Sequence, residues 1–238
     1  MESFHLADCL ASGKPWFGHA TSPCLPFIIQ SELPKLIHRS RAEKFAKGIS
    51  GSSNTFLNSV ITETIPYIKL DSGYGIGALD KQIALSRNRF SDAHIVLILD
   101  PLYKMLSGHI TDEYDIRKLL DNLDDIKEKR DLTIVLIHHT RLTRVDSSGN
   151  VIDLGPEEAM GSSYLNNWVD TMVKVKLTNP YTGGNRVHMT FELTRHAETI
   201  LPGFTVEWSR ATLQPRIIAR DTIEEVEMED ISIRTEEE

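Results

Sequence analysis

The fold is indicated by one run of residues, His94-Ile95-Val96-Leu97-Ile98-Leu99-Asp100-Pro101. Its apolar residues are continuous rather than alternating, which is typical of a strand covered on both faces, as in a parallel sheet. Leu132–Ile137 is a second such run, and the residues between them, 111–130, have the pattern of an amphipathic helix. Strand, helix and strand in this order predict a βαβ unit, and therefore an α/β fold with a mainly parallel sheet flanked by helices.

Outward from this unit, further elements are predicted on both sides. On the N-terminal side we expect a helix over 3–12 ended by Gly13, a strand over 25–30 and another strand over 65–70. Ser31 is predicted to be the N-cap of a helix that has Pro34 in its first turn and runs to about Gly48. After Asp170 the pattern changes to short β-rich segments at 172–177, 186–193, 204–208 and 215–219. These predict antiparallel strands that extend the C-terminal edge of the sheet.

Composition separates a body from a tail. The chain has 238 residues and a net charge of −8, and residues 221–238 contain nine acids and one base, so the tail alone accounts for that charge. We predict a core over 1–220 and an acidic, disordered tail over 221–238. Because residues 1–220 have no net charge, the composition neither excludes nucleic acid as a partner nor argues for it. The sequence has no apolar run long enough to span a membrane and no signal-peptide pattern, and its two cysteines fit no metal or disulfide spacing. A cytoplasmic protein is therefore expected.

Polar side chains follow three of the predicted strands. They are Glu32, Asp100 and the pair His138-His139. Ligands of open α/β sheets bind at the carboxyl ends of the strands, so these residues predict one cleft. Asp100 could hold Mg²⁺ beside a nucleotide, or only cap the turn before Pro101. Glu32 could orient or deprotonate an attacking water, or only complement a helix dipole.

The two histidines are expected to point in opposite directions, because side chains alternate along a strand. The one that faces the cleft could sense a γ-phosphate, and the other could have a purely structural role. Two further candidates lie later in the chain. Gly161-Ser162-Ser163 could start a helix or belong to a loop that responds to nucleotide or nucleic acid. Arg195 could reach a neighbouring subunit's nucleotide or form a surface salt bridge.

In combination, these motifs resemble a known family. The order of these motifs along the chain is similar to that of the RecA-like ATPases. The motifs are strand-Glu32, strand-Asp100-Pro101-Leu102, strand-His138-His139, Gly161-Ser162-Ser163 and Trp168-Val169-Asp170. The branch is AAA_25, related to hexameric replicative helicases of the RepA and DnaB kind, and the resemblance spans about residues 3–215. It implies ATP and Mg²⁺ as ligands, with Asp100 as the Walker B acid and Glu32 as the catalytic glutamate. It also implies His138 or His139 as the γ-phosphate sensor, a hexameric ring in which Arg195 acts in trans, and single-stranded DNA as a partner.

The family's phosphate-binding loop, Gly-x-x-x-x-Gly-Lys-Ser/Thr, has no complete counterpart in these residues. By resemblance, Ser3 falls at the position of the motif's hydroxyl, which binds nucleotide and Mg²⁺, and Glu2 at that of its lysine. Ser12-Gly13-Lys14-Pro15 looks like the loop but is predicted to end a helix instead of opening one. We expect the chain to be truncated at its N-terminus and to hydrolyse ATP poorly, because the lysine and the amide cradle stabilise phosphate charge.

Three functions are therefore considered. The first is an ATPase of DNA replication or recombination type, impaired in hydrolysis. The second is a non-catalytic RecA-like scaffold or DNA-binding module. The third and least favoured is a metal-dependent hydrolase that uses Asp100, Glu32 and the histidines.

Overall fold

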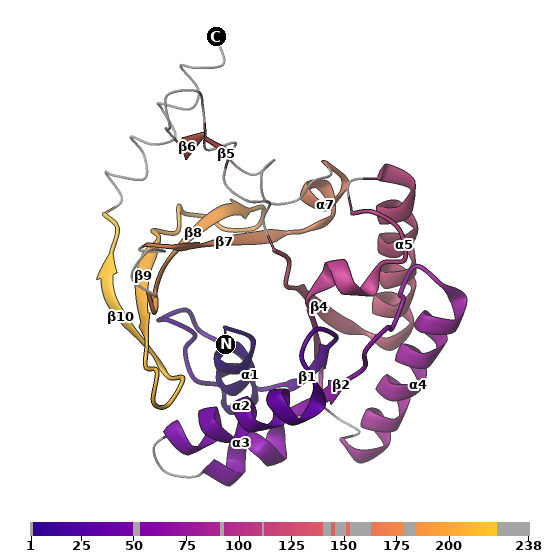
Figure 1. Ribbon diagram of the computed structural model, residues 1–238, viewed down its shortest axis with the longest axis horizontal. Coiled ribbons are helices and arrows are strands. Elements are labelled where there is room, and N and C mark those ends of the chain that lie inside the picture. The colour runs from indigo at the N-terminus through magenta and orange to yellow at the C-terminus, as the bar shows by residue number, and fades with distance from the viewer. Residues whose placement is uncertain are drawn as a thin grey trace. The chain divides into compact units, whose positions relative to one another are not determined.

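The computed structural model describes residues 2–49, 53–90, 93–110, 112–139, 144–145, 151–152, 163–178 and 184–222. The chain divides into two compact units, Met1–Trp168 and Val169–Glu238. Figure 1 shows the helices and strands of both. Each unit is described by itself below.

A four-stranded parallel sheet forms the centre of the first unit. Its order is β2-β1-β3-β4, with β2 Ile61–Thr64, β1 Leu25–Gln30, β3 Ile95–Asp100 and β4 Leu132–Leu136. All six residues of β1 and the first five of β3 are buried. The sequence prediction of these two strands and of β4 is confirmed.

The strand predicted at 65–70 is wrong, because the strand β2 ends at Thr64. Ile65 still donates its N–H to the carbonyl of Gln30, but Pro66 follows. Proline has no N–H with which to continue a ladder. Tyr67 then takes a positive φ of 68°, which turns the chain away from the sheet.

Helices cover both faces of this sheet, which explains why its strands are apolar on both sides. Figure 1 shows α1 (Glu2–Ser12), α2 (Lys35–Gly48) and α3 (Ser53–Ser59) on one side, with α4 (Gly73–Arg89) and α5 (Glu113–Arg130) on the other. On the first side, the rings of Phe4, His38, Phe45 and Phe56 form one cluster with centroid separations of 5.0–6.0 Å. This cluster joins the three helices.

The start of α2 differs from the sequence prediction, and α4 was not predicted. Ser31 is not an N-cap: α2 begins after Pro34, and the N–H of Ser31 instead donates to the carbonyl of Asp100, which continues the sheet pairing. No prediction was made for α4, whose first turns contain three glycines that weaken a local helix signal. Its N-cap is Ser72, whose hydroxyl accepts a hydrogen bond from the Gly75 N–H.

The helix α5 was predicted as 111–130 and has strong local signals at both ends. Asp112 caps its start by accepting the N–H groups of Tyr114 and Asp115. Asp131 ends it in a left-handed conformation. Four short elements are also described in the first unit: the 3₁₀ turn Leu102–Met105, the paired strands β5 (Arg144–Val145) and β6 (Val151–Ile152), and α7 (Ser163–Trp168).

The second unit is an antiparallel sheet of order β10-β9-β8-β7. Its strands are β7 Thr171–Leu177, β8 Arg186–Thr194, β9 Phe204–Trp208 and β10 Pro215–Arg220. Each of the four predicted strands is present to within a residue at either end. Within the described residues they pair with one another in a sheet of their own rather than continuing the parallel sheet. The predicted class, a mainly parallel α/β sheet with helices and C-terminal antiparallel strands, is confirmed.

The predicted domain boundaries and location remain predictions. The boundaries are 1–220 and 221–238, and residues 223–238 lie outside the described part of the chain. The predicted location is cytoplasmic. Among the described residues, no helix combines the length and apolar character that a membrane crossing needs.

Candidate nucleotide-binding and catalytic site

The carboxyl ends of β1, β3 and β4 are held together by hydrogen bonds that continue beyond the strands. The Ser31 N–H donates to the carbonyl of Asp100 at 3.0 Å, and the Ile137 N–H donates to that of Leu99 at 2.9 Å. The carbonyl of Ile137 in turn accepts from Leu102 at 2.8 Å. The segments that carry the predicted cleft residues are therefore fixed to the sheet.

Ser3 and Asp100 are in direct contact although 97 positions separate them. The Ser3 hydroxyl donates to Oδ2 of Asp100 at 3.1 Å. Ser3 lies in the first turn of α1 and is only 5% exposed. The start of α1 therefore faces the end of β3, where the partial positive charge of a helix N-terminus and a carboxylate meet.

Glu32 contacts two residues from the segments that follow β3 and β4. Tyr103 donates its hydroxyl to Oε1 of Glu32 at 3.1 Å, and Nε2 of His139 lies 3.8 Å from Oε2. The Tyr103 and His139 rings also meet edge to face, with centroids 5.6 Å apart. Partial burial, together with the hydrogen bond to Glu32 and its charge, raises the pKa of Tyr103.

The two histidines, which follow the end of β4 at Leu136, have different surroundings. The side chain of His139 is 61% exposed and lies beside Glu32. His138 is half-buried, and burial, followed by the neighbouring His139, lowers its pKa to about 4. His138 is therefore neutral at pH 7.

Three buried polar atoms at these strand ends have no hydrogen-bond partner in the described structure. They are Oε1 of Gln30, Oγ of Ser31 and Nδ1 of His138. Buried polar atoms in folded proteins are nearly always paired, so three at the edge of one sheet are unusual. They mark this edge as a place where a polar ligand or water fits.

The remaining candidates are Arg195 and the segment Gly161-Ser162-Ser163. Arg195 belongs to the second unit, where its Nε donates to the carbonyl of Val169 at 3.0 Å. Gly161 and Ser162 lie outside the described residues, and of Ser163 only the backbone, at the start of α7, is described. Their predicted roles are therefore neither supported nor opposed by the geometry.

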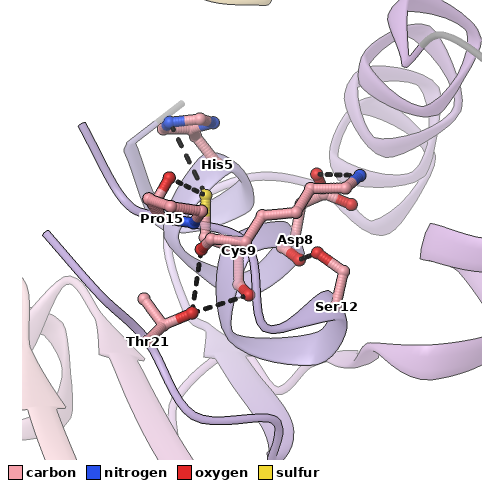
Figure 2. A network of polar contacts seen from close by, with 7 residues as sticks. His5, Asp8, Cys9, Ser12, Pro15 and Thr21 are labelled. Carbon is pink, nitrogen blue, oxygen red and sulfur yellow. Dashed lines mark hydrogen bonds and ion pairs between the residues drawn. The ribbon is translucent and has the colours of Figure 1, made fainter. Parts of the chain in front are cut away.

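The segment Ser12-Gly13-Lys14-Pro15 closes the far end of α1 (Figure 2). Gly13 has a φ of 65°, the conformation of a residue that follows a helix end. Thr21 donates one hydroxyl to the carbonyls of both Cys9 and Lys14, at 3.1 and 2.8 Å. This segment therefore ends α1, and Ser3 lies about ten residues or roughly 15 Å away along the helix.

Cys9 lies inside that network, with its Sγ 3.8 Å from Nε2 of His5 and 3.6 Å from the carbonyl of Pro15. Burial, with a smaller effect of Asp8, raises the pKa of Cys9 to about 11, which makes it a poor nucleophile. Across the described ranges, no group of three or more His, Cys, Asp or Glu side chains is arranged to hold a metal ion.

Sequence comparison identifies the family to which these features belong. The AAA_25 family, described as an AAA domain, matches residues 3–144. The chain belongs to the AAA_25 family. A search of curated protein sequences gives no match.

Solved structures show which fold this AAA_25 chain has. It is similar to a solved structure described as an ATPase domain, with a TM-score of 0.61 and 9% identity over 81% of this chain and 74% of that one. It is also similar to a DnaB-like replicative helicase described with its primase interactions, with a TM-score of 0.60 and 10% identity over 79% of this chain and 50% of that one. Identities this low establish the RecA-like fold alone.

The matched region divides the candidate residues. It begins at Ser3 and includes Glu32, Asp100, His138 and His139, and it ends before Gly161 and Arg195. Tyr103 and Gln30 also lie inside it but were not predicted. Tyr103 follows Asp100-Pro101-Leu102 directly, and this proximity to the candidate residue Asp100 was the only signal in the sequence.

Proposed function

We propose that this chain is a RecA-like ATPase of DNA replication or recombination type that binds Mg²⁺ and a nucleoside triphosphate at the carboxyl edge of its parallel sheet. The observation that carries the proposal is the hydrogen bond between Ser3 and Asp100 at the start of α1. A hydroxyl at a helix start beside an acid at a strand end is the pair that holds Mg²⁺ in P-loop ATPases.

The residues present fit a magnesium ion. Mg²⁺ prefers oxygen ligands and keeps several of its waters, so one hydroxyl and one carboxylate suffice as protein contacts. Ser3 and Asp100 supply these two oxygens, with their side chains already at hydrogen-bond distance. When bound, the ion neutralises charge that develops on the transferred phosphoryl group.

Glu32 is proposed as the general base that orients and deprotonates the attacking water. Its carboxylate lies at the end of β1, next to the strand that carries Asp100. Tyr103 holds Oε1, which leaves Oε2, on the side of His139, as the oxygen available to water. His139 or the neutral His138 would contact the γ-phosphate and respond to its loss.

A ring of identical subunits, hexameric by resemblance, is proposed as the working assembly, with Arg195 acting on the neighbouring nucleotide and Gly161-Ser162-Ser163 in a loop that responds to it. Single-stranded DNA is the proposed partner of such a ring. Light scattering tests the assembly, and anisotropy of a labelled oligonucleotide at moderate salt tests DNA binding. A monomer that binds no DNA contradicts this part of the proposal.

The deciding experiment measures metal binding rather than turnover. The 238 residues contain no Gly-x-x-x-x-Gly-Lys-Ser/Thr motif, so we expect their own hydrolysis to be slow. Mn²⁺ in place of Mg²⁺ gives an electron paramagnetic resonance signal that reports binding with and without ADP. We expect Asp100→Asn to abolish nucleotide-dependent Mn²⁺ binding, and Asp125→Asn, at an exposed position on α5, to leave it intact.

Two results separate the candidate functions. If Asp100→Asn binds Mn²⁺ and ADP like the unchanged chain, the metal site is wrong and the non-catalytic scaffold is favoured. If phosphate release can be measured, Glu32→Gln should lower kcat by about 10²–10⁴-fold while Mn²⁺ binding persists. An equal loss of both in Glu32→Gln contradicts its role as the base.

A further inference from the structure

Gln30 occupies a position beside the proposed metal ligands. It is the last residue of β1, and its Cα pairs in register with that of Asp100 on β3. Register partners of neighbouring strands direct their side chains to the same face of a sheet. The amide of Gln30 therefore lies on the face from which Asp100 reaches Ser3.

The amide oxygen of Gln30 is buried without a hydrogen-bond partner. The residue is only 3% exposed, and Oε1 has no hydrogen-bond partner. The hydroxyl of the next residue, Ser31, is also buried without a partner. An apolar side chain of the same size would avoid this cost of desolvation, so packing alone does not explain a glutamine here.

We propose that Oε1 of Gln30 accepts a hydrogen bond from a water bound to the metal ion that Ser3 and Asp100 hold. Gln30 is thus a positioning residue, and the inference rests on the proposed metal site. An amide oxygen is an acceptor, and each water on Mg²⁺ offers two donors, so the two chemistries match. The amide oxygen of Gln30, which has no hydrogen-bond partner among the described residues, becomes satisfied when the hydrated ion binds.

This assignment predicts opposite effects on stability and on binding. Gln30→Met keeps the length of the side chain and removes its polar atoms. The melting temperature without ligand should rise by about 2–6 °C, because a buried, unpaired acceptor disappears. The affinity for Mn²⁺ in the presence of ADP should fall by about 10–100-fold. A loss of this size is usual when a side chain that hydrogen-bonds to a ligand of the metal is removed.

The matched control is Gln82→Met on α4, a half-buried glutamine on the opposite side of the sheet from α1. Its Mn²⁺ affinity should not change. A Gln30→Met variant that melts lower, or fails to fold, overturns the proposal, because the amide is then a structural group. Unchanged Mn²⁺ affinity in Gln30→Met overturns it as well.

The failure of this inference can be told apart from that of the proposed function. If Asp100→Asn loses Mn²⁺ and Gln30→Met does not, the metal site stands and only the role of Gln30 is wrong. If neither variant loses Mn²⁺, the metal site itself is wrong. Gln30→Leu, measured in parallel, should repeat the pattern of Gln30→Met, with higher stability and weaker binding.

Discussion

A methyl group added at Gly75 in the first turns of α4 would collide with backbone atoms. An ideal Cβ there would overlap the carbonyl oxygen of Lys69 and lie 2.5 Å from its carbonyl carbon. The Lys69 peptide cannot easily move away, because its carbonyl oxygen accepts a hydrogen bond from the Ser72 hydroxyl at 2.6 Å. The Lys69 side chain is also held, through its Nζ, by the carbonyls of Lys104 and Leu106.

The expected cost of Gly75→Ala follows from these contacts. Overpacking against fixed atoms costs about 1–3 kcal/mol, and loss of the Ser72–Lys69 hydrogen bond about 1 kcal/mol. The gain in helix propensity from glycine to alanine offsets about 1 kcal/mol. The net loss of about 1–3 kcal/mol corresponds to a melting temperature lower by about 2–12 °C.

Gly77 in the same helix provides the control, because an added Cβ there meets nothing within 4 Å. Gly77→Ala should stabilise the protein by about 0.5–1 kcal/mol. Urea unfolding followed by circular dichroism at 222 nm measures both variants. If Gly75→Ala is as stable as Gly77→Ala, the close approach of α4 to Lys69 is not a constraint and the reasoning is refuted.

Three further predictions concern titrating groups. Hydrogen bonds from Arg130 and Lys129, at the end of α5, lower the pKa of Asp80 to about 2. The contribution of Asp80 to stability is therefore complete above about pH 4 and is lost as the pH falls towards 2. Asp80→Asn should therefore be less stable than the unchanged protein by about 0.5–1 kcal/mol at pH 7 in urea unfolding. That difference should vanish near pH 2. Cys24 should react with a disulfide reagent at pH 8 faster than Cys9. Cys24 is partly exposed, whereas Cys9 is 2% exposed and has a pKa of about 11. Equal reaction rates in the two single-cysteine variants would contradict the burial of Cys9. Glu32→Gln should lower the raised pKa of Tyr103, followed by ¹³Cζ NMR during alkaline titration, and an unchanged value would show that the two side chains do not interact in solution.

Much of the fold could be predicted from the sequence, and the errors have local causes. Strands such as Ile95–Asp100 are covered on both faces and have a strong apolar signal. The position of β2 was missed because the Ile65-Pro66 pair ends its ladder earlier than the apolar pattern suggests. The helix α4 was missed because its first turns contain three glycines, which helix propensity disfavours. Of these three, Gly75 alone is required by a close contact, the one with the Lys69 backbone.

The sequence could predict those residues of the candidate site that follow an apolar strand. Glu32 and Asp100 follow apolar strands, so the sequence indicates that they are neighbours at one sheet edge. Tyr103 and Gln30 could not be found in this way. The contact of Tyr103 with Glu32 depends on how two loops fold, and the unsatisfied amide of Gln30 depends on strand register and on the packing above it.

The contact between Ser3 and Asp100 also bears on how the protein is made. The two residues are 97 positions apart, so α1 has no partner for Ser3 until β3 has been synthesised. At about 5–20 residues per second, that interval lasts roughly 5–20 s on the ribosome. The ring partners of Phe4, which are His38, Phe45 and Phe56, all precede β3 in the chain and are therefore available within this interval. The helix α1 can therefore pack against its neighbours before the hydrogen bond between Ser3 and Asp100 forms, and this bond is the later step in placing its start.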